Sequence, residues 1–202
     1  MILSIWELID IAVITLVIGW LFADFFRMIR KPAEDHPLLR KPGIDWENIR
    51  FAAIAAAPAV ILHEAGHKLV GMLYGLTPVI HAYYKGLLLG VVLKLIRFPV
   101  VVFVPGYADI CAGNTQQCMQ FLGMNPLASA AIAFGGPAAN LLLWLGSELV
   151  IRKKWVSKRY MPFVFMSKRI NMWLFFLNMI PLGFFDGAKV LDGIILYFRM
   201  VF

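Results

Sequence analysis

The sequence predicts an α-helical integral membrane protein with about four transmembrane helices, the last one broken, and a short membrane-associated β element. Composition is the first observation: 61% of the 202 residues are hydrophobic, 15% are charged, and the mean hydropathy is +0.77. Soluble domains average about 45–50% apolar and about 25% charged residues. A soluble chain of this length has no means of hiding so much apolar surface. The low charge also excludes disorder, and it argues against nucleic acid as a partner.

Long apolar runs are the second observation, because a helix needs about 20 apolar residues to cross the hydrocarbon core. The first run, over 5–26, lies in a segment 1–27 that we assign to an N-terminal transmembrane anchor or gate helix. A basic loop over 28–50 follows. The second span covers 51–76, and the third, rich in Ala, Ser and Gly, covers 127–151. Small residues let membrane helices approach closely, which predicts that the third span is central.

The region 77–125, between the second and third spans, differs from the spans in its residue composition. Residues 86–97 and 98–104 are rich in Val, Leu and Ile and contain Gly and Pro, which predicts short strands or re-entrant structure. An open sheet edge cannot face lipid, so such strands must lie at the interface or against protein. Cys111 and Cys118 lie in a polar loop, where a small disulfide and two unrelated thiols are both compatible with the sequence.

The fourth span, in segment 170–202, is interrupted near Pro181 and Gly183. Lys and Arg collect in the segments 27–50 and 151–169, which predicts cytoplasmic loops in contact with anionic headgroups. This placement makes the spans alternate consistently and puts the N-terminus outside the cell membrane, together with the β element. We therefore predict a multi-pass protein with that topology.

The third observation is the motif His63-Glu64-Ala65-Gly66-His67 in the second span. Residues four apart share one face of a helix, so both imidazoles can bind one metal ion. Glu64, beside them, is placed to take the proton of an attacking water. Ionisable residues inside a membrane are costly and are usually functional. The motif therefore predicts a zinc site and hydrolytic chemistry.

A hydrolytic zinc site usually has three protein ligands and one open position, so a third ligand must come from another segment. Asp186 follows the predicted break in the fourth span, where irregular backbone can aim a carboxylate inward. Asp192 in a second Asp-Gly pair is a weaker alternative, because on a helix it would point roughly 240° away from Asp186. Glu148, near the end of the third span, is the candidate for a zincin that uses Glu as third ligand.

The motifs together resemble the site-2 protease family of intramembrane zinc metalloproteases. The His-Glu-x-x-His motif is followed by Asn178-x-x-Pro181-x-x-x-x-Asp186-Gly187 in a later span. The stretch GGPAAN, ending at Asn140 in the third span, is similar to the Gly-Pro-x-x-Asn element of that family. The resemblance covers roughly residues 51–190.

This resemblance implies that residues 51–202 form an intramembrane metalloprotease core with one Zn²⁺ per chain. It implies His63, His67 and Asp186 as ligands and Glu64 as catalytic base. It also implies that Asn178 and Asn140 orient the substrate or stabilise an oxyanion. The expected activity is hydrolysis of peptide bonds within or next to the transmembrane segment of a single-span substrate. The alternative is a catalytically inactive metal-binding scaffold, and members of the family often place the β element on the cytoplasmic side.

Overall fold

The computed structural model describes residues 3–30, 45–98, 104–183 and 185–202, and within these it is mostly helical. Its elements, in chain order, are α1 (Ile5–Arg30), α2 (Trp46–Leu73), β1 (Val79–Ala82), α3 (Tyr84–Leu95), β2 (Gly106–Asp109), α4 (Thr115–Met124), α5 (Pro126–Lys153), α6 (Met161–Asn178) and α7 (Asp186–Val201). The predicted basic loop over 28–50 lies mostly outside the described residues.

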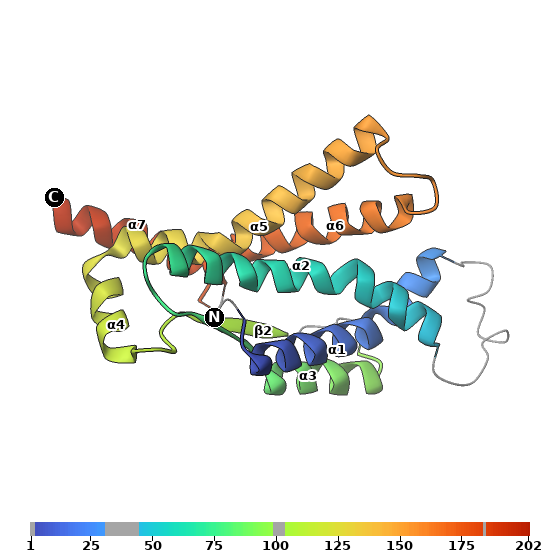
Figure 1. The fold of residues 1–202 in the computed structure, drawn as a ribbon, viewed down its shortest axis with the longest axis horizontal. Coiled ribbons are helices and arrows are strands. Elements are labelled where there is room, and N and C mark those ends of the chain that lie inside the picture. Colours follow the sequence, from blue (N-terminus) through green and yellow to red (C-terminus); the bar gives the residue numbers. More distant parts are fainter. Residues whose placement is uncertain (1–2, 31–44, 99–103, 184) are drawn as a thin grey trace.

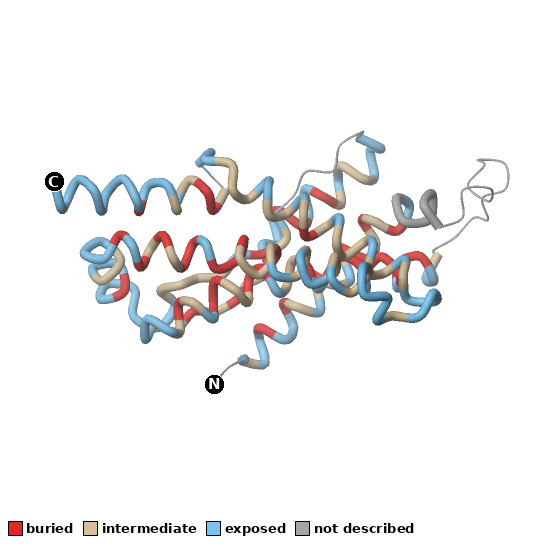
Figure 2. Tube along the Cα trace, turned by 90° about the horizontal axis from the view of Figure 1, so that it is seen from above, coloured by how far each residue is buried: buried red, intermediate tan, exposed pale blue. Residues whose placement is uncertain are grey.

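Helices α2 and α5 form the centre of the molecule, with α1 and α3 on one side and α6 and α7 on the other (Figure 1). The α1–α2 contact is apolar and close: Ile14 and Ile18 are buried with Ala52 and Ala56, and a Cβ on Gly19 would lie 2.9 Å from the Ala53 Cβ. The buried residues concentrate in the middle of the bundle, while the last turns of α7 are exposed (Figure 2). Many large apolar side chains remain exposed, as expected for a protein solvated by lipid.

Three helices of the described chain are long and apolar enough to cross a membrane: Ile5–Asp24, Trp46–Leu73 and Pro126–Lys153. They correspond to the first three predicted spans. No described helix of the predicted fourth span is both long and apolar enough to be counted among them. It begins earlier than expected, at Met161, so that α6 includes Lys168 and Arg169, and it ends at Asn178 before the predicted break.

The region between α2 and α5 contains a two-stranded antiparallel sheet, but its strands are not where the sequence pattern placed them. Strand β1 pairs with β2 in the register Val79 with Asp109. The predicted strand at 86–97 is wrong, because this stretch forms α3 and one turn beyond it. Gly86 and Gly90, four residues apart, give α3 a narrow buried face, and a Cβ on Gly86 would lie 2.2 Å from the Val104 carbonyl oxygen. Most of the predicted strand at 98–104 lies outside the described residues.

Cys111 and Cys118 form a disulfide, with their Cα atoms 5.5 Å apart. The bridge joins the end of the sheet to α4, whose first turn is capped by the Asn114 side chain accepting from the Gln117 N–H. The sequence left this pairing open, and the structure decides it.

Polar contacts hold α1 against the rest of the core. The Glu7 carboxylate, on α1, forms a buried ion pair with Lys68 of α2 and accepts the Ile80 N–H of β1 at 2.9 Å. One turn further, Asp10 accepts the Tyr84 hydroxyl at 2.6 Å, and this hydrogen bond raises the pKa of Tyr84. Helix α1 is therefore fixed both to the helix that bears the His-Glu-x-x-His motif and to the edge of the sheet.

Candidate metal centre

The two motif histidines lie on the buried side of α2, where it faces α5. His63 and His67 are 6% and 7% exposed, and Glu64 between them is 8% exposed. Gly66, between the two histidines in sequence, lets α2 and α5 approach closely, because a Cβ there would lie 2.3 Å from the Gly135 carbonyl oxygen of α5. The small residues of the third span thus bring α5 against the motif, as the sequence predicted.

Asp186 is the first residue of α7 and reaches the same place from the other side of the bundle. The loop after α6 folds back on the end of that helix, and Gly187 makes the contact close, since a Cβ there would lie 2.4 Å from the Met179 carbonyl oxygen. The glycine after the aspartate therefore permits the backbone approach that directs the carboxylate inward.

Three ligand atoms converge between these elements. Asp186 Oδ2 lies 3.0 Å from His63 Nε2 and 3.2 Å from His67 Nε2, and the two Nε2 atoms are 3.2 Å apart. Among the described residues, His63, His67 and Asp186 form a group that could hold a metal ion. Glu64 lies close enough to interact electrostatically with all three.

A hydrogen-bond network fixes the tautomer of His63. Asn140 Nδ2 donates to the Ala59 carbonyl oxygen at 3.0 Å and to Asn171 Oδ1 at 2.8 Å, so Asn140 Oδ1 is left as an acceptor. That oxygen lies 2.6 Å from His63 Nδ1. The Nδ1 atom must therefore carry the hydrogen, and Nε2 presents its lone pair to the centre.

The tautomer of His67 is also fixed by its hydrogen-bond partner. Its Nδ1 lies 2.8 Å from the Ile132 carbonyl oxygen and 3.3 Å from the Gly136 N–H. Because the carbonyl is closer and can only accept, Nδ1 donates to it. His67 Nε2 is then also an unprotonated acceptor facing the centre, and each imidazole is oriented by an oxygen behind it.

The residues present fit a zinc ion on two grounds. First, two imidazole lone pairs and a carboxylate oxygen converge with no hydrogen between them, which is favourable only around a cation. Second, ligands about 2.05 Å from a tetrahedral zinc lie about 3.3 Å apart, close to the separations of 3.0–3.2 Å found here.

Gly136 provides space beside this centre. A Cβ at Gly136 would lie 2.4 Å from His67 Nε2 and 2.6 Å from His63 Nε2. Any side chain at this position would press on the two metal-facing nitrogens. Pro137, the next residue, interrupts the hydrogen-bond ladder of α5 at the same level.

The described contacts of the other candidate residues are outside this group of three. Asn178 donates to the Leu174 carbonyl oxygen of its own helix at 3.0 Å. Asp192 is exposed, and the glycine after it packs α7 on α5, with Gly193 against the Pro126 carbonyl. Glu148 pairs with Arg152 and Lys168, both 2.6 Å away.

Sequence reasoning missed two parts of the network. Asn171 of α6 is 1% exposed, and its amide donates to the Ser167 carbonyl at 2.8 Å while its oxygen accepts from Asn140. An amide in the apolar run of the predicted fourth span was an available signal, because such a group needs a buried partner. The Ile132 carbonyl, a backbone acceptor, left no such signal.

The chain is similar to the protein named "Putative zinc metalloprotease MJ0611" of Methanocaldococcus jannaschii. The two are 32% identical over 142 residues, which is 70% of this chain and 69% of the relative. No family model matches the chain. No solved structure matches it either. The extent of this similarity shows that the chain belongs to the same zinc metalloprotease family as that relative.

Proposed function

We propose that the protein is an intramembrane zinc endopeptidase of the site-2 protease type. Its substrates would be single-span membrane proteins, cleaved within or next to the transmembrane segment, as in regulated intramembrane proteolysis. The observation that carries the proposal is the convergence of His63, His67 and Asp186 within 3.0–3.2 Å, in a bundle whose α2 and α5 are apolar enough to cross a membrane.

In this reaction, each residue of the site would have a distinct role. Zinc, when bound, supplies a Lewis acid that activates water and polarises the scissile carbonyl group. The Glu64 carboxylate removes a proton from the water and later delivers it to the leaving amine. Asn140 and the Ile132 carbonyl hold the two imidazoles so that both Nε2 atoms face the ion.

The substrate helix must unwind, because the carbonyl groups of a helix are hydrogen-bonded internally. Backbone groups released in the membrane need new partners, and pairing with the two-stranded sheet would satisfy them. We propose that the basic segments 27–50 and 151–169 face the cytoplasm and anionic headgroups, which puts the sheet outside the cell membrane.

The test is cleavage of a reconstituted single-span substrate by the wild type and the Glu64→Ala variant, with and without a zinc chelator. The matched control is Glu148→Ala, which removes a carboxylate that pairs with Arg152 and Lys168. We expect E64A and the chelator to abolish cleavage while E148A retains it. Equal cleavage by wild type and E64A would contradict the proposal that the protein is a zinc protease. Loss of zinc in E148A would instead favour a zincin with a Glu ligand.

A further inference from the structure

A cavity of about 410 Å³ lies between the N-terminal ends of α2 and α6. Its walls are largely apolar, with Phe51 and Ile54 on α2 facing Pro162 and Phe163 on α6. The hairpin of α5 and α6 diverges from α2 toward this end of the molecule (Figure 1). Most of its lining residues belong to the two basic segments 27–50 and 151–169.

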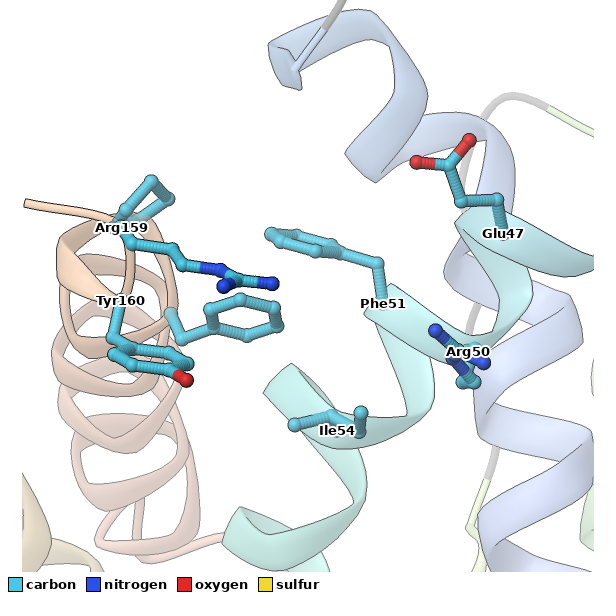
Figure 3. Close-up of a pocket in the computed structure, with 8 residues that line it drawn as sticks. Glu47, Arg50, Phe51, Ile54, Arg159 and Tyr160 are labelled. Carbon is cyan, nitrogen blue, oxygen red and sulfur yellow. The ribbon is translucent and has the colours of Figure 1, made fainter.

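Charged side chains stand at this cavity. Arg159 reaches from the start of α6 toward Phe51, beside the ring of Tyr160, while Glu47 and Arg50 lie on α2 (Figure 3). Among the described lining residues, two arginines and one glutamate give a net charge of +1. The neighbouring segment 151–169 adds further Lys and Arg and contains no acidic residue.

A second, more open hollow of about 450 Å³ lies next to the first, and Ile54 and Phe163 stand between the two. It lies between α2, α5 and α6 and is lined mostly by apolar side chains, including Leu142 and Leu143. At its inner end it reaches Pro58, whose neighbour Ala59 accepts the hydrogen bond from Asn140. The two hollows are adjacent on the face between α2 and α6, with arginines at the outer one, and we call the pair the groove.

We propose that this groove binds an anionic phospholipid, with the phosphate at Arg159 and Arg50 and one acyl chain in the second hollow. A groove between membrane helices that opens at the headgroup level is filled by lipid, and basic pockets between helices select anionic headgroups. The proposal is independent of the protease reaction. It assigns a binding site to residues outside the metal centre.

The experiment measures binding of dioleoyl phosphatidylglycerol and dioleoyl phosphatidylcholine to the purified full chain by native mass spectrometry. A basic side chain near an anionic headgroup contributes about 1 kcal/mol, or about five-fold in affinity. We expect Arg159→Gln and Arg50→Gln each to weaken phosphatidylglycerol binding about five-fold. The control K153Q/K154Q removes two exposed cations that do not line the cavity, and we expect it to change binding less than two-fold.

A second pair of variants tests the acyl chain. Gly146 lines the second hollow, and a Cβ on it would meet nothing within 4 Å, so Gly146→Leu places an apolar side chain in the space proposed for the acyl chain. Gly123 of α4 is equally open and lies elsewhere, so Gly123→Leu is the matched control. We expect G146L to lose the phosphatidylglycerol adduct and G123L to retain it.

Four results would overturn the proposal. Equal binding of the two lipids, or equal losses in the arginine variants and in K153Q/K154Q, would remove the headgroup site. Full binding by G146L would remove the acyl-chain site. Displacement of phosphatidylglycerol by millimolar inorganic phosphate would indicate a simple anion site instead of a lipid site.

Discussion

The Asn140 side chain on α5 lies 2.6 Å from His63 Nδ1 on α2, and it is itself fully buried. Each of its hydrogen-bonding groups has a partner: the Ala59 carbonyl and Asn171 take its amide hydrogens, and His63 donates to its oxygen. Asn140 therefore orients a candidate zinc ligand. The substrate-orienting or oxyanion-stabilising role that the family resemblance implied for Asn140 stays a prediction.

The first prediction concerns this contact. Asn140→Ala removes the acceptor of the His63 Nδ1–H and the donor to Asn171 Oδ1. Loss of such a supporting group typically lowers metal affinity 10–100-fold. Zinc affinity, measured by competition with a chelator, should fall by that factor. Asn178→Ala is the matched control, because that amide bonds its own helix, and its effect should stay below two-fold. Equal affinities in the two variants would contradict the orienting role.

Gly136 gives the second prediction. The Cβ of Gly136→Ala would approach both metal-facing nitrogens to within 2.6 Å, so one imidazole must move away from the ion. We expect zinc content after dialysis to fall at least ten-fold. Gly146→Ala, on the same helix with open space around its Cβ, should keep its zinc. Alanine there should also stabilise the helix by up to about 1 kcal/mol. Normal zinc content in G136A would show that α5 does not pack so tightly against the site.

The motif spacing was enough to predict which helices carry the site, because helical periodicity places His63 and His67 on one face whatever surrounds them. The predicted helix break and the family motif favoured Asp186, which the structure brings to the two histidines. The strand prediction failed at 86–97, where Leu and Val suit both a strand and a buried helix. The stretch forms α3, with Gly86, Leu87 and Gly90 buried.

Contacts between distant segments explain the other differences. Nothing in the local sequence indicates that Asn171 bonds Asn140, or that Glu7 accepts the Ile80 N–H, because both contacts depend on how the helices pack. The contacts of the Gly-Pro-x-x-Asn element also depend on how the helices pack. Its residues were recognised by resemblance, but their positions against His63 and His67 are known only from the three-dimensional arrangement.

The third prediction separates the two Asp-Gly pairs. Asp186 is 9% exposed and touches both imidazoles, whereas Asp192 is exposed. Asp186→Ala should lose zinc on dialysis against a weak chelator, and Asp192→Ala should keep about one ion per chain. Metal analysis of the two proteins decides between them. Retention in D186A with loss in D192A would exchange their roles.

The ion pair of Glu7 and Lys68 gives the fourth prediction. Both side chains are buried, at 2% and 5% exposure, so removing one partner leaves an unpaired charge. Such a loss typically costs about 3–5 kcal/mol, while replacing both partners by apolar residues is often nearly neutral. Lys68→Met should therefore lower the unfolding temperature in detergent strongly. E7L/K68M should recover only part of it, because the Ile80 N–H then loses its acceptor.

The control for this pair is Asp24→Asn, which breaks a contact of 3.2 Å with Lys94. Asp24 is 61% exposed on its side chain, so its pair should contribute less than about 1 kcal/mol. If K68M and D24N lowered the unfolding temperature equally, the buried pair would not be what fixes α1 to α2.

The fifth prediction concerns the side of the membrane on which the sheet lies. The disulfide between Cys111 and Cys118 suits an oxidising compartment, and the basic segments favour the opposite side as cytoplasmic. In the Cys118→Ser variant, Cys111 should react with a membrane-impermeant maleimide added to intact cells. In a C111S/C118S background, the thiol introduced by K158C should react only after permeabilisation. The reverse pattern would put the sheet in the cytoplasm, and the charge distribution would then not determine the orientation of this protein.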